Sequence, residues 1–322
     1  MEEFMIKAYT LKNKHNIEVT ILNLGGIIHE IKTPDREGNL DNIIHGFKHI
    51  EDYTKNDAYF GAIIGRTAGR IKEGLYTLNN KDYKMPTVDR GNGLHGGANG
   101  FDKKMWDVEE CLNSLILTCV STDGEEGFPG TVEMTVTYTL TDEDELIIDY
   151  KGITDQDTLL NLTNHSYFNL NPKETILEME LMVNSDQLIE IDDVSIPTGN
   201  LLDVTETPFD FRTPKKIGRD IFLEHQQLTN GGGYDHPWLV KGDVKLKLSD
   251  ETTGRQLIMS SDQPCVVLYS YNFPLEGHKN HQGLAIEFQK EPDSLNHPHF
   301  TSCILKKDEI YTQQTVYKFK VE

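Results

Sequence analysis

A strict alternation of apolar and polar residues constrains the fold of this chain more than any other feature of its sequence. From 131 to 140 the even-numbered positions are Val, Met, Val, Tyr and Leu, and the odd-numbered positions are Thr or Glu. A period of two indicates a strand with one buried face, and β-branched and aromatic residues favour strands. An acidic turn at 141–145 leads to a returning apolar run at Leu146–Tyr150. The whole segment therefore predicts a β-hairpin.

The same alternation recurs along most of the chain. A second hairpin is predicted by alternation over 244–248, a turn at Asp250–Gly254 and an apolar run at Gln256–Met259. Further strands are expected at Ile17–Leu24, Leu75–Leu78, Ser114–Val120 and Val266–Tyr271. Helical periodicity is weak, and Ile217–Leu228 is the best candidate for a helix. Many strands separated by Gly, Asn and Asp turns predict an all-β sandwich or barrel. Because there is no linker or repeat, we expect residues 1–322 to form a single domain.

Charge and cysteine usage narrow the classes of partner. The chain has 52 Asp and Glu against 31 Lys and Arg, a net charge of −21. Such a surface repels nucleic acid and anionic membranes, so we expect neither as a partner, and a neutral rather than polyanionic ligand. The four cysteines form no C-x-x-C pair, which disfavours zinc or a redox dithiol and fits a reducing compartment. The N-terminus lacks a signal-peptide pattern, and no apolar run is long enough to cross a bilayer. We therefore expect a cytoplasmic protein.

The stretch Asn161–Leu170 carries a polar set on one alternating face. If it is a strand, one face presents Asn161, Thr163, His165, Tyr167 and Asn169. A polar face of this kind either meets solvent or lines a site for a polar ligand. Asn, Thr and Tyr beside His suit a hydroxylated ligand, whereas a half-exposed strand with a hydrogen-bonded His explains the same pattern without a site.

Glu287 lies in the middle of the apolar run Leu284–Gln289. Alternation places it on a face with Ala285 and Gln289, opposite three large apolar side chains. Burial disfavours an ionised carboxylate unless it is paired or hydrogen bonded, and functional carboxylates collect at such positions. An exposed edge strand is the alternative.

Two glycine-rich segments hold further candidates. Gly65–Ile71 places Arg66 and Arg70 four residues apart, and their planar guanidinium groups suit hydroxyl or carboxylate recognition as well as surface salt bridges. Segment 91–100 contains G-x-G-x-x-G, but no helix can open behind it, so we reject a dinucleotide site. What remains is a loop that presents His95, in which glycines let the backbone approach a ligand, or an ordinary surface loop.

Asp235 lies between a run of three glycines and Pro237, with Trp238 close by. Asp beside Trp is typical of sugar sites, where the carboxylate accepts from hydroxyls and the ring packs on C–H faces. A tight turn with a capping Asp fits equally well. His297-Pro-His299 has a metal-like composition, but the intervening Pro and the lack of a carboxylate cluster favour a loop.

Taken together, these stretches resemble the galactose mutarotase (aldose 1-epimerase) family over nearly the whole chain. The motifs that carry the resemblance are Gly65–Ile71, Leu94–Gly97 with Gly100–Trp106, Asn161–Leu170, Ile196–Gly199 with Thr207–Arg212, Gly232–His236, and Glu287 followed by Pro292–Pro298. The resemblance implies a large antiparallel β-sandwich, a supersandwich, with an open sugar-binding cleft. It also implies interconversion of the α and β anomers of a free aldohexose, galactose or glucose, without metal or cofactor.

The resemblance also assigns roles by motif: Glu287 as general base, His165 as general acid, and Arg70, His95 and Asp235 as hydroxyl-binding residues. Two positions depart from the family pattern. Gly69 stands where Asn is common, and Val267 stands where Gln is common. Both departures bear on sugar preference more than on the chemistry.

The implied reaction needs a base and an acid at the same moment. Opening a pyranose removes the proton of the C1 hydroxyl and adds one to the ring oxygen. Reference pKa values of ~4.3 for Glu and ~6.5 for His leave a window with Glu ionised and His protonated. Two other functions also fit: a glycoside hydrolase with Glu287 and Asp235 as its carboxylate pair, and a sugar-binding module without catalysis. The oligomeric state stays open.

Overall fold

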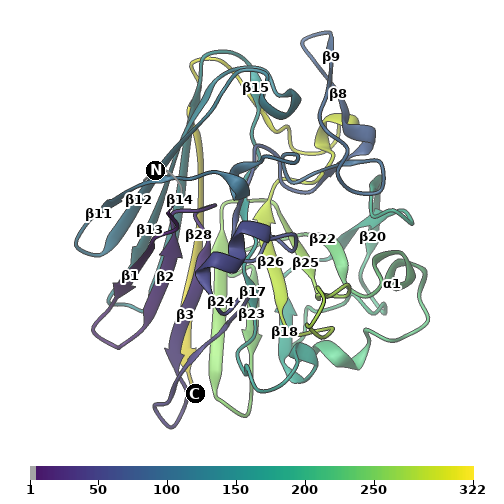
Figure 1. Ribbon diagram of the computed structural model, residues 1–322. Coiled ribbons are helices and arrows are strands. Elements are labelled where there is room, and N and C mark those ends of the chain that lie inside the picture. Colours follow the sequence, from purple (N-terminus) through teal and green to yellow (C-terminus); the bar gives the residue numbers. More distant parts are fainter. Residues whose placement is uncertain (1–4) are drawn as a thin grey trace.

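The largest sheet of the computed structural model, which describes residues 5–322, is antiparallel and has nine strands (Figure 1). Residues 1–4 lie outside the described part of the chain. They belong to the N-terminal stretch that was considered above for a signal-peptide pattern. The strands run in the order β11 (Asp107–Glu110), β12 (Ser114–Ser121), β13 (Val132–Leu140), β14 (Glu145–Thr154), β28 (Tyr311–Val321), β24 (Arg255–Ser261), β23 (Leu246–Ser249), β18 (Glu180–Val183) and β21 (Lys215–Lys216). The two hairpins predicted from the sequence are confirmed as β13–β14 and β23–β24.

A second antiparallel sheet of seven strands packs against the first. Its order is β20 (Pro197–Asp203), β19 (Gln187–Ile191), β22 (Asp235–Leu239), β25 (Cys265–Tyr269), β26 (Leu284–Gln289), β17 (Tyr167–Phe168) and β5 (Ile44–His45). Val266, Ile286 and Phe288 of this sheet belong to the same buried cluster as Val136 and Leu146 of the nine-stranded sheet. The two sheets therefore share one core, and the predicted antiparallel β-sandwich is confirmed.

Smaller sheets and short helices complete the fold. A four-stranded sheet contains β1 (Ala8–Lys12), β2 (Glu18–Leu22), β3 (Ile28–Pro34) and β4 (Leu40–Asn42). The two-stranded pairs are β7 (Arg70–Ile71) with β10 (Gly93–Leu94), β6 (Ile63–Ile64) with β16 (Thr163–Asn164), β8 (Leu75–Leu78) with β9 (Lys81–Lys84), and β15 (Thr158–Leu159) with β27 (Ile304–Leu305). Helical segments are α1 (Gln226–Gly231) and the 3-10 turns η1 (Ile50–Lys55), η2 (Lys72–Gly74), η3 (Phe101–Lys103), η4 (Glu125–Gly127), η5 (Ile176–Glu178), η6 (Ile217–Arg219) and η7 (Ser294–Asn296).

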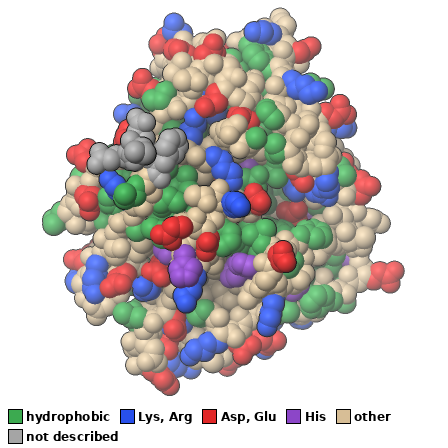
Figure 2. All heavy atoms as spheres, viewed as in Figure 1, with side chains coloured by type: hydrophobic (Ala, Val, Ile, Leu, Met, Phe, Trp, Pro, Cys, Tyr) green, Lys and Arg blue, Asp and Glu red, His purple; other side chains and the backbone are tan. Residues whose placement is uncertain are grey.

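Charged side chains of both signs lie on the face of the molecule seen in Figure 2. Figure 2 shows acidic side chains interspersed with Lys and Arg over one face, in keeping with the net charge of −21. None of the helices within residues 5–322 has both the length and the hydropathy needed to cross a bilayer.

The expectation of one continuous strand at Asn161–Leu170 is wrong. β16 pairs with β6, whereas β17 pairs with β26 and β5. The Asn164 side chain causes the break, because its oxygen accepts from the Ser166 backbone N–H and hydroxyl while its amide donates to the Gly61 carbonyl. Side-chain bonds of this kind mimic a backbone turn. All ten residues are buried, so the stretch is not a half-exposed strand.

The helix predicted at Ile217–Leu228 is also wrong over most of that range. The chain forms η6, then a turn in which the Leu223 N–H donates to the Asp220 carbonyl, and only then α1. The Asp220 carboxylate accepts from Lys215 Nζ at 2.6 Å, which anchors this turn to β21. α1 begins afresh where His225 Nδ1 accepts from the Gln227 N–H. Local hydrogen bonds of polar side chains and backbone groups thus determine the structure here, and the weak helical periodicity of the sequence does not.

Candidate active site

A cavity of about 510 Å3 lies against the face of the seven-stranded sheet that points away from the core. Its volume is within the range of small-molecule sites, roughly 300–1,000 Å3. Alternation turns these residues of three adjacent strands toward it: Asp235 and Pro237 of β22, Val267 and Tyr269 of β25, and Glu287 and Gln289 of β26. The register places Glu287 opposite Val267, and Val267 opposite Pro237. Glu287 therefore lies on a central strand, which excludes the edge-strand alternative.

The short β7–β10 pair forms another part of the cavity wall. Arg70 is registered opposite Leu94, and His95 follows directly. Gly96 packs against the neighbouring backbone, where a Cβ would lie 2.0 Å from the Gly65 carbonyl oxygen. Glycine is required so that this loop can pack on the neighbouring backbone. The loop thus presents Leu94 and His95 to the cavity from a fixed position.

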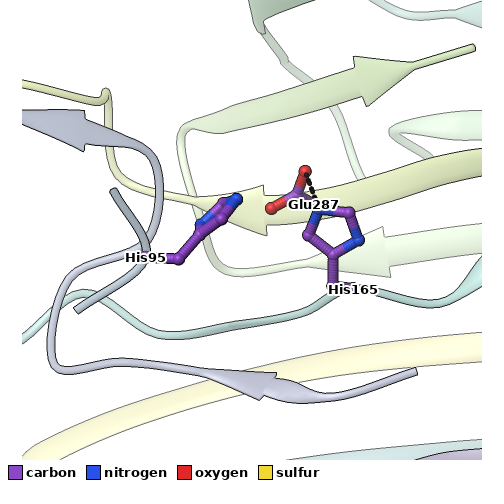
Figure 3. Close-up of side chains that lie close together, drawn as sticks. All are labelled: His95, His165 and Glu287. Atoms are coloured by element: carbon purple, nitrogen blue, oxygen red, sulfur yellow. Dashed lines mark ion pairs between the residues drawn. The ribbon is translucent and has the colours of Figure 1, made fainter. Parts of the chain in front are cut away.

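His165 and Glu287 form a buried pair in the cavity wall (Figure 3). His165 Nε2 lies 3.4 Å from Glu287 Oε1, and the two side chains are 5% and 3% exposed. His165 sits two residues before β17, whose Tyr167 lies opposite Ala285 of β26. Of the polar set predicted on Asn161–Leu170, His165 and Tyr167 line the cavity, whereas Asn161, Thr163 and Asn169 do not.

Burial reverses the protonation order expected from reference values. Removal from water raises the pKa of Glu287 to about 8, and the nearby negative charge of Asp235 adds to this against the opposing charge of Arg70. Burial also lowers the pKa of His165 to about 4. Both effects favour uncharged groups. Near neutral pH the empty pair therefore holds one proton, carried by Glu287, with His165 neutral.

One ring nitrogen of His95 is engaged by the backbone. Burial holds its pKa well below the usual range, so the ring is neutral. The Gly69 N–H donates to Nδ1 at 3.2 Å, and the ring proton must then lie on Nε2. One ligand atom from each of His95, His165 and Glu287 lies within 4.8 Å of the others, a spacing that a metal ion can bridge. The His95 tautomer offers such an ion no free lone pair, and the cluster suits a hydroxylated ligand better.

Arg70 is held in place by two carboxylates. Its Nε donates to Asp89 Oδ2 at 2.7 Å, and its Nη1 lies 3.6 Å from Asp235 Oδ2. Although burial acts to raise the pKa of Asp89, Arg70 and Arg90 together lower it. The structure thus places Arg70, His95, His165, Asp235 and Glu287 around one cavity.

Arg66 has a different role from Arg70. It is 2% exposed, and its guanidinium donates to Ser121 Oγ and to the carbonyls of Ser121 and Pro129. It therefore ties loops together and does not line the cavity.

Trp238 does not form the sugar platform expected beside Asp235. It is 1% exposed and belongs to the shared core, where its Nε1 donates to the Phe209 carbonyl. The aromatic wall of the cavity comes instead from Tyr59, Tyr167, Tyr269, Tyr271 and Phe273. The 3.6 Å contact with Arg70, not the proximity of Trp, marks Asp235 as a site residue.

His297 and His299 anchor a neighbouring strand. Their Nε2 atoms donate to the carbonyls of Pro197 and Gly199, at 3.0 and 2.8 Å. The loop interpretation of this His-Pro-His segment thus agrees with its contacts.

The two departures from the family pattern also line the cavity. Gly69 has φ +75°, and a Cβ there would lie 2.7 Å from Pro292 Cβ. An asparagine is therefore excluded unless Pro292 moves. The nearby Gln289 side chain is buried, and its Oε1 has no hydrogen-bond partner within residues 5–322. Alternation placed Gln289 on the face of Glu287, but it was not taken as a site residue; Asp89 and Tyr59 have no local sequence pattern that distinguishes them.

The fold and this cavity define the class of galactose mutarotase-like β-sandwich proteins. The family model described as aldose 1-epimerase matches residues 7–318, and the chain belongs to this family. It is 36% identical to the galactose mutarotase of Bos taurus, with 100% of this chain and 94% of that protein aligned. It is 34% identical to the aldose 1-epimerase of Escherichia coli strain K12, with 98% and 96% aligned.

Two solved structures resemble the whole fold. The aldose epimerase homologue from C. elegans has a TM-score of 0.92 at 30% identity, with 98% of this chain and 99% of that chain covered. The galactose 1-epimerase from Lactobacillus acidophilus NCFM has a TM-score of 0.90 at 27% identity, with 100% and 96% covered.

Proposed function

We propose that this chain is an isomerase, an aldose 1-epimerase that interconverts the α and β anomers of a free aldohexose such as galactose or glucose. The observation that carries this is the buried His165–Glu287 pair, 3.4 Å apart on the wall of a cavity of about 510 Å3. Membership of the family and the names of the relatives support the reaction and the sugar class.

In the proposed mechanism, Glu287 and His165 exchange protons with the sugar. The reactive form of the pair is the tautomer that carries its single proton on His165 instead of Glu287. In this form ionised Glu287 takes the proton of the C1 hydroxyl while protonated His165 gives its proton to the ring oxygen. The bond between C1 and the ring oxygen breaks, and its electron pair stays on that oxygen. The products are the open-chain aldehyde, protonated Glu287 and neutral His165. This is the protonation state that burial favours.

Ring closure reverses the two roles. Rotation about the C1–C2 bond presents the other face of the carbonyl. His165 then takes the proton back from the hydroxyl that becomes the ring oxygen, and Glu287 returns its proton to the carbonyl oxygen. Each proton transfer is worth about 10²–10⁴-fold in rate. Two together supply roughly 5–11 kcal/mol, and no step needs a metal or a cofactor.

Arg70, His95 and Asp235 are proposed to hold the other hydroxyls. Arg70 and the Nε2–H of His95 are donors, and Asp235 is an acceptor, so the three match both roles of a hydroxyl group. From composition we also propose that the chain is one domain, that it works in the cytoplasm, and that its partner is a monosaccharide and not nucleic acid or a membrane.

Polarimetry on freshly dissolved α-D-galactose and α-D-glucose tests the proposal. The protein should speed the approach to equilibrium rotation for at least one of these sugars. Tight sugar binding without faster exchange would instead indicate a non-catalytic module. Release of nitrophenol from a nitrophenyl galactoside would indicate a hydrolase, but Glu287 has His165 as its partner while Asp235 lies beside Arg70.

A further inference from the structure

Tyr59 covers both histidines of the cavity. Its ring centroid lies 4.7 Å from that of His95 and 5.8 Å from that of His165. The two histidine rings are themselves 5.2 Å apart and perpendicular. Tyr59 also lines the cavity. One aromatic ring therefore contacts a proposed proton donor and a proposed hydroxyl-binding residue at the same time.

The backbone of Tyr59 is in the left-handed region, with φ +58°. This conformation is a true outlier for a bulky aromatic residue, and such strain persists only where the surroundings impose it. Asn56 imposes it here. Its carbonyl accepts from the Tyr59 N–H at 3.2 Å, and its side chain both accepts from the Phe60 N–H and donates to the Phe60 carbonyl. Asn56 is 1% exposed, so this clamp is part of the packed structure.

Apart from the contact of Nε2 with Glu287, the ring of His165 is oriented by packing. Its Nδ1 is buried and has no hydrogen-bond partner within residues 5–322. Tyr59 and Tyr167 contact the ring, with Tyr167 at 5.0 Å. Tyr167 is fixed through its hydroxyl, which donates to the Ala58 carbonyl directly before Tyr59. Without the Tyr59 ring, His165 would lose one of these supports and gain contact with water.

We propose that Tyr59 is a positioning residue whose ring holds His165 and His95 in their reactive orientations, and that its strained backbone serves this placement. The expected changes in kcat and KM rest on the proposed function. Within residues 5–322 the Tyr59 side chain contacts its neighbours through the ring and makes no hydrogen bond through the hydroxyl. The ring, and not the phenol, should therefore matter.

Two variants distinguish the effect of the Tyr59 ring from the effects of its hydroxyl and of its backbone strain. Tyr59→Phe keeps the ring, and kcat should stay within about threefold of wild type. Tyr59→Gly removes the ring and accepts a positive φ without strain. Its kcat should fall about 10- to 100-fold, the scale of a small misplacement of a catalytic group, and KM should rise by a smaller factor. Should Tyr59→Gly fail to fold, Tyr59→Asn is the second ringless variant, because Asn tolerates the left-handed region.

The matched control is Glu206→Gly. Glu206 is exposed with φ +60° and lies outside the cavity lining. The Glu206→Gly substitution relieves a similar backbone strain, and kcat and KM should not change. A Tyr59→Phe variant as slow as the ringless variants would overturn the proposal, and so would wild-type kcat in a folded ringless variant.

A spectroscopic measurement tests the inference independently of activity. An NMR spectrum that correlates the imidazole nitrogens with the ring protons reports the tautomer and environment of His165. These signals should be unchanged in Tyr59→Phe and shifted in Tyr59→Gly. Unshifted signals in Tyr59→Gly would show that the ring positions nothing. A wild-type protein without mutarotation would defeat the proposed function, while this spectrum would still decide the role of Tyr59.

Discussion

The nine-stranded and seven-stranded sheets share one core but differ in what their second faces do. On β13 buried positions alternate with exposed or half-exposed ones, because the outer face of that sheet meets solvent. On β26 all six positions are buried, because the second face of that sheet lies under the cavity. Solvent therefore enforces the alternation of the first sheet. The second sheet can place a carboxylate such as Glu287 where water cannot stabilise its charge.

Because the two sheets differ in this way, we expect residues of the cavity wall to govern activity and residues of the nine-stranded sheet to govern stability. Glu287 Oε2 and His165 Nδ1 are buried without a hydrogen-bond partner within residues 5–322, and such groups cost free energy. The nine-stranded sheet buries mainly apolar side chains, each worth roughly 1.5–3 kcal/mol. Changes in the cavity wall should therefore alter turnover with little loss of stability, and changes in the nine-stranded sheet should do the reverse.

The largest effect is expected for Glu287→Gln. Removal of one proton-transfer group should lower kcat about 10²–10⁴-fold, measured by polarimetry. The melting temperature should be equal or higher, because a desolvated carboxyl is lost. Glu145→Gln in the nine-stranded sheet is the control, since it removes only a half-exposed ion pair with Lys318. Near-wild-type turnover in folded Glu287→Gln would rule out Glu287 as a proton-transfer group.

His165→Asn should lower kcat by a similar factor, about 10²–10⁴-fold, and should leave the melting temperature close to that of wild type. The matched variant is His299→Asn, which removes a histidine that donates to the Gly199 carbonyl outside the cavity. If both variants kept full turnover, the acid–base role would have to lie elsewhere.

Leu146→Ala tests the other sheet. Leu146 is fully buried in the shared core, and a Leu→Ala change of this kind costs about 2–5 kcal/mol of unfolding free energy. The kcat per folded molecule should be unchanged below the melting transition. Ile153→Ala, at a 43% exposed position on the same strand, should change stability by about 0.5 kcal/mol or less. A loss of kcat per folded molecule in Leu146→Ala would contradict the claim that the nine-stranded sheet affects stability and not turnover.

Asp235→Asn should have the smallest effect of the cavity variants. A charge-assisted hydrogen bond is worth about 1.5–3 kcal/mol, which corresponds to roughly 10- to 100-fold in affinity. Asp235 also raises the pKa of Glu287 through its negative charge. Its removal should shift the alkaline limit of activity to lower pH. Loss of turnover as complete as in Glu287→Gln would instead favour the glycosidase mechanism.

The same contrast explains what the sequence could predict. Five strands of the nine-stranded sheet, β12, β13, β14, β23 and β24, were predicted because solvent on one face imposes a period of two. Glu287 was found because a carboxylate in an apolar run is conspicuous. The break at Asn164 was missed, because it depends on side-chain bonds to Ser166 and Gly61 that no periodicity reports.

The remaining site residues are assembled by long-range contacts. Asp89 joins the site through Arg70, and Tyr59 through two histidines distant in sequence. Neither has a local signature, since a lone Asp or Tyr in a loop is common. Reference pKa values also did not predict the protonation order of Glu287 and His165, because burial, with the charge of Asp235 acting on Glu287, reverses it.

The pH dependence of kcat/KM for wild-type mutarotation tests the shared proton of His165 and Glu287 most directly. The spontaneous rate in each buffer is subtracted, and kcat/KM reports the free enzyme. The rate should rise as pH increases through about 4, where the pair loses its second proton and gains a base. It should fall as pH increases through about 8, where the last proton leaves and no acid remains. A rate that stays constant through both limits would contradict the account.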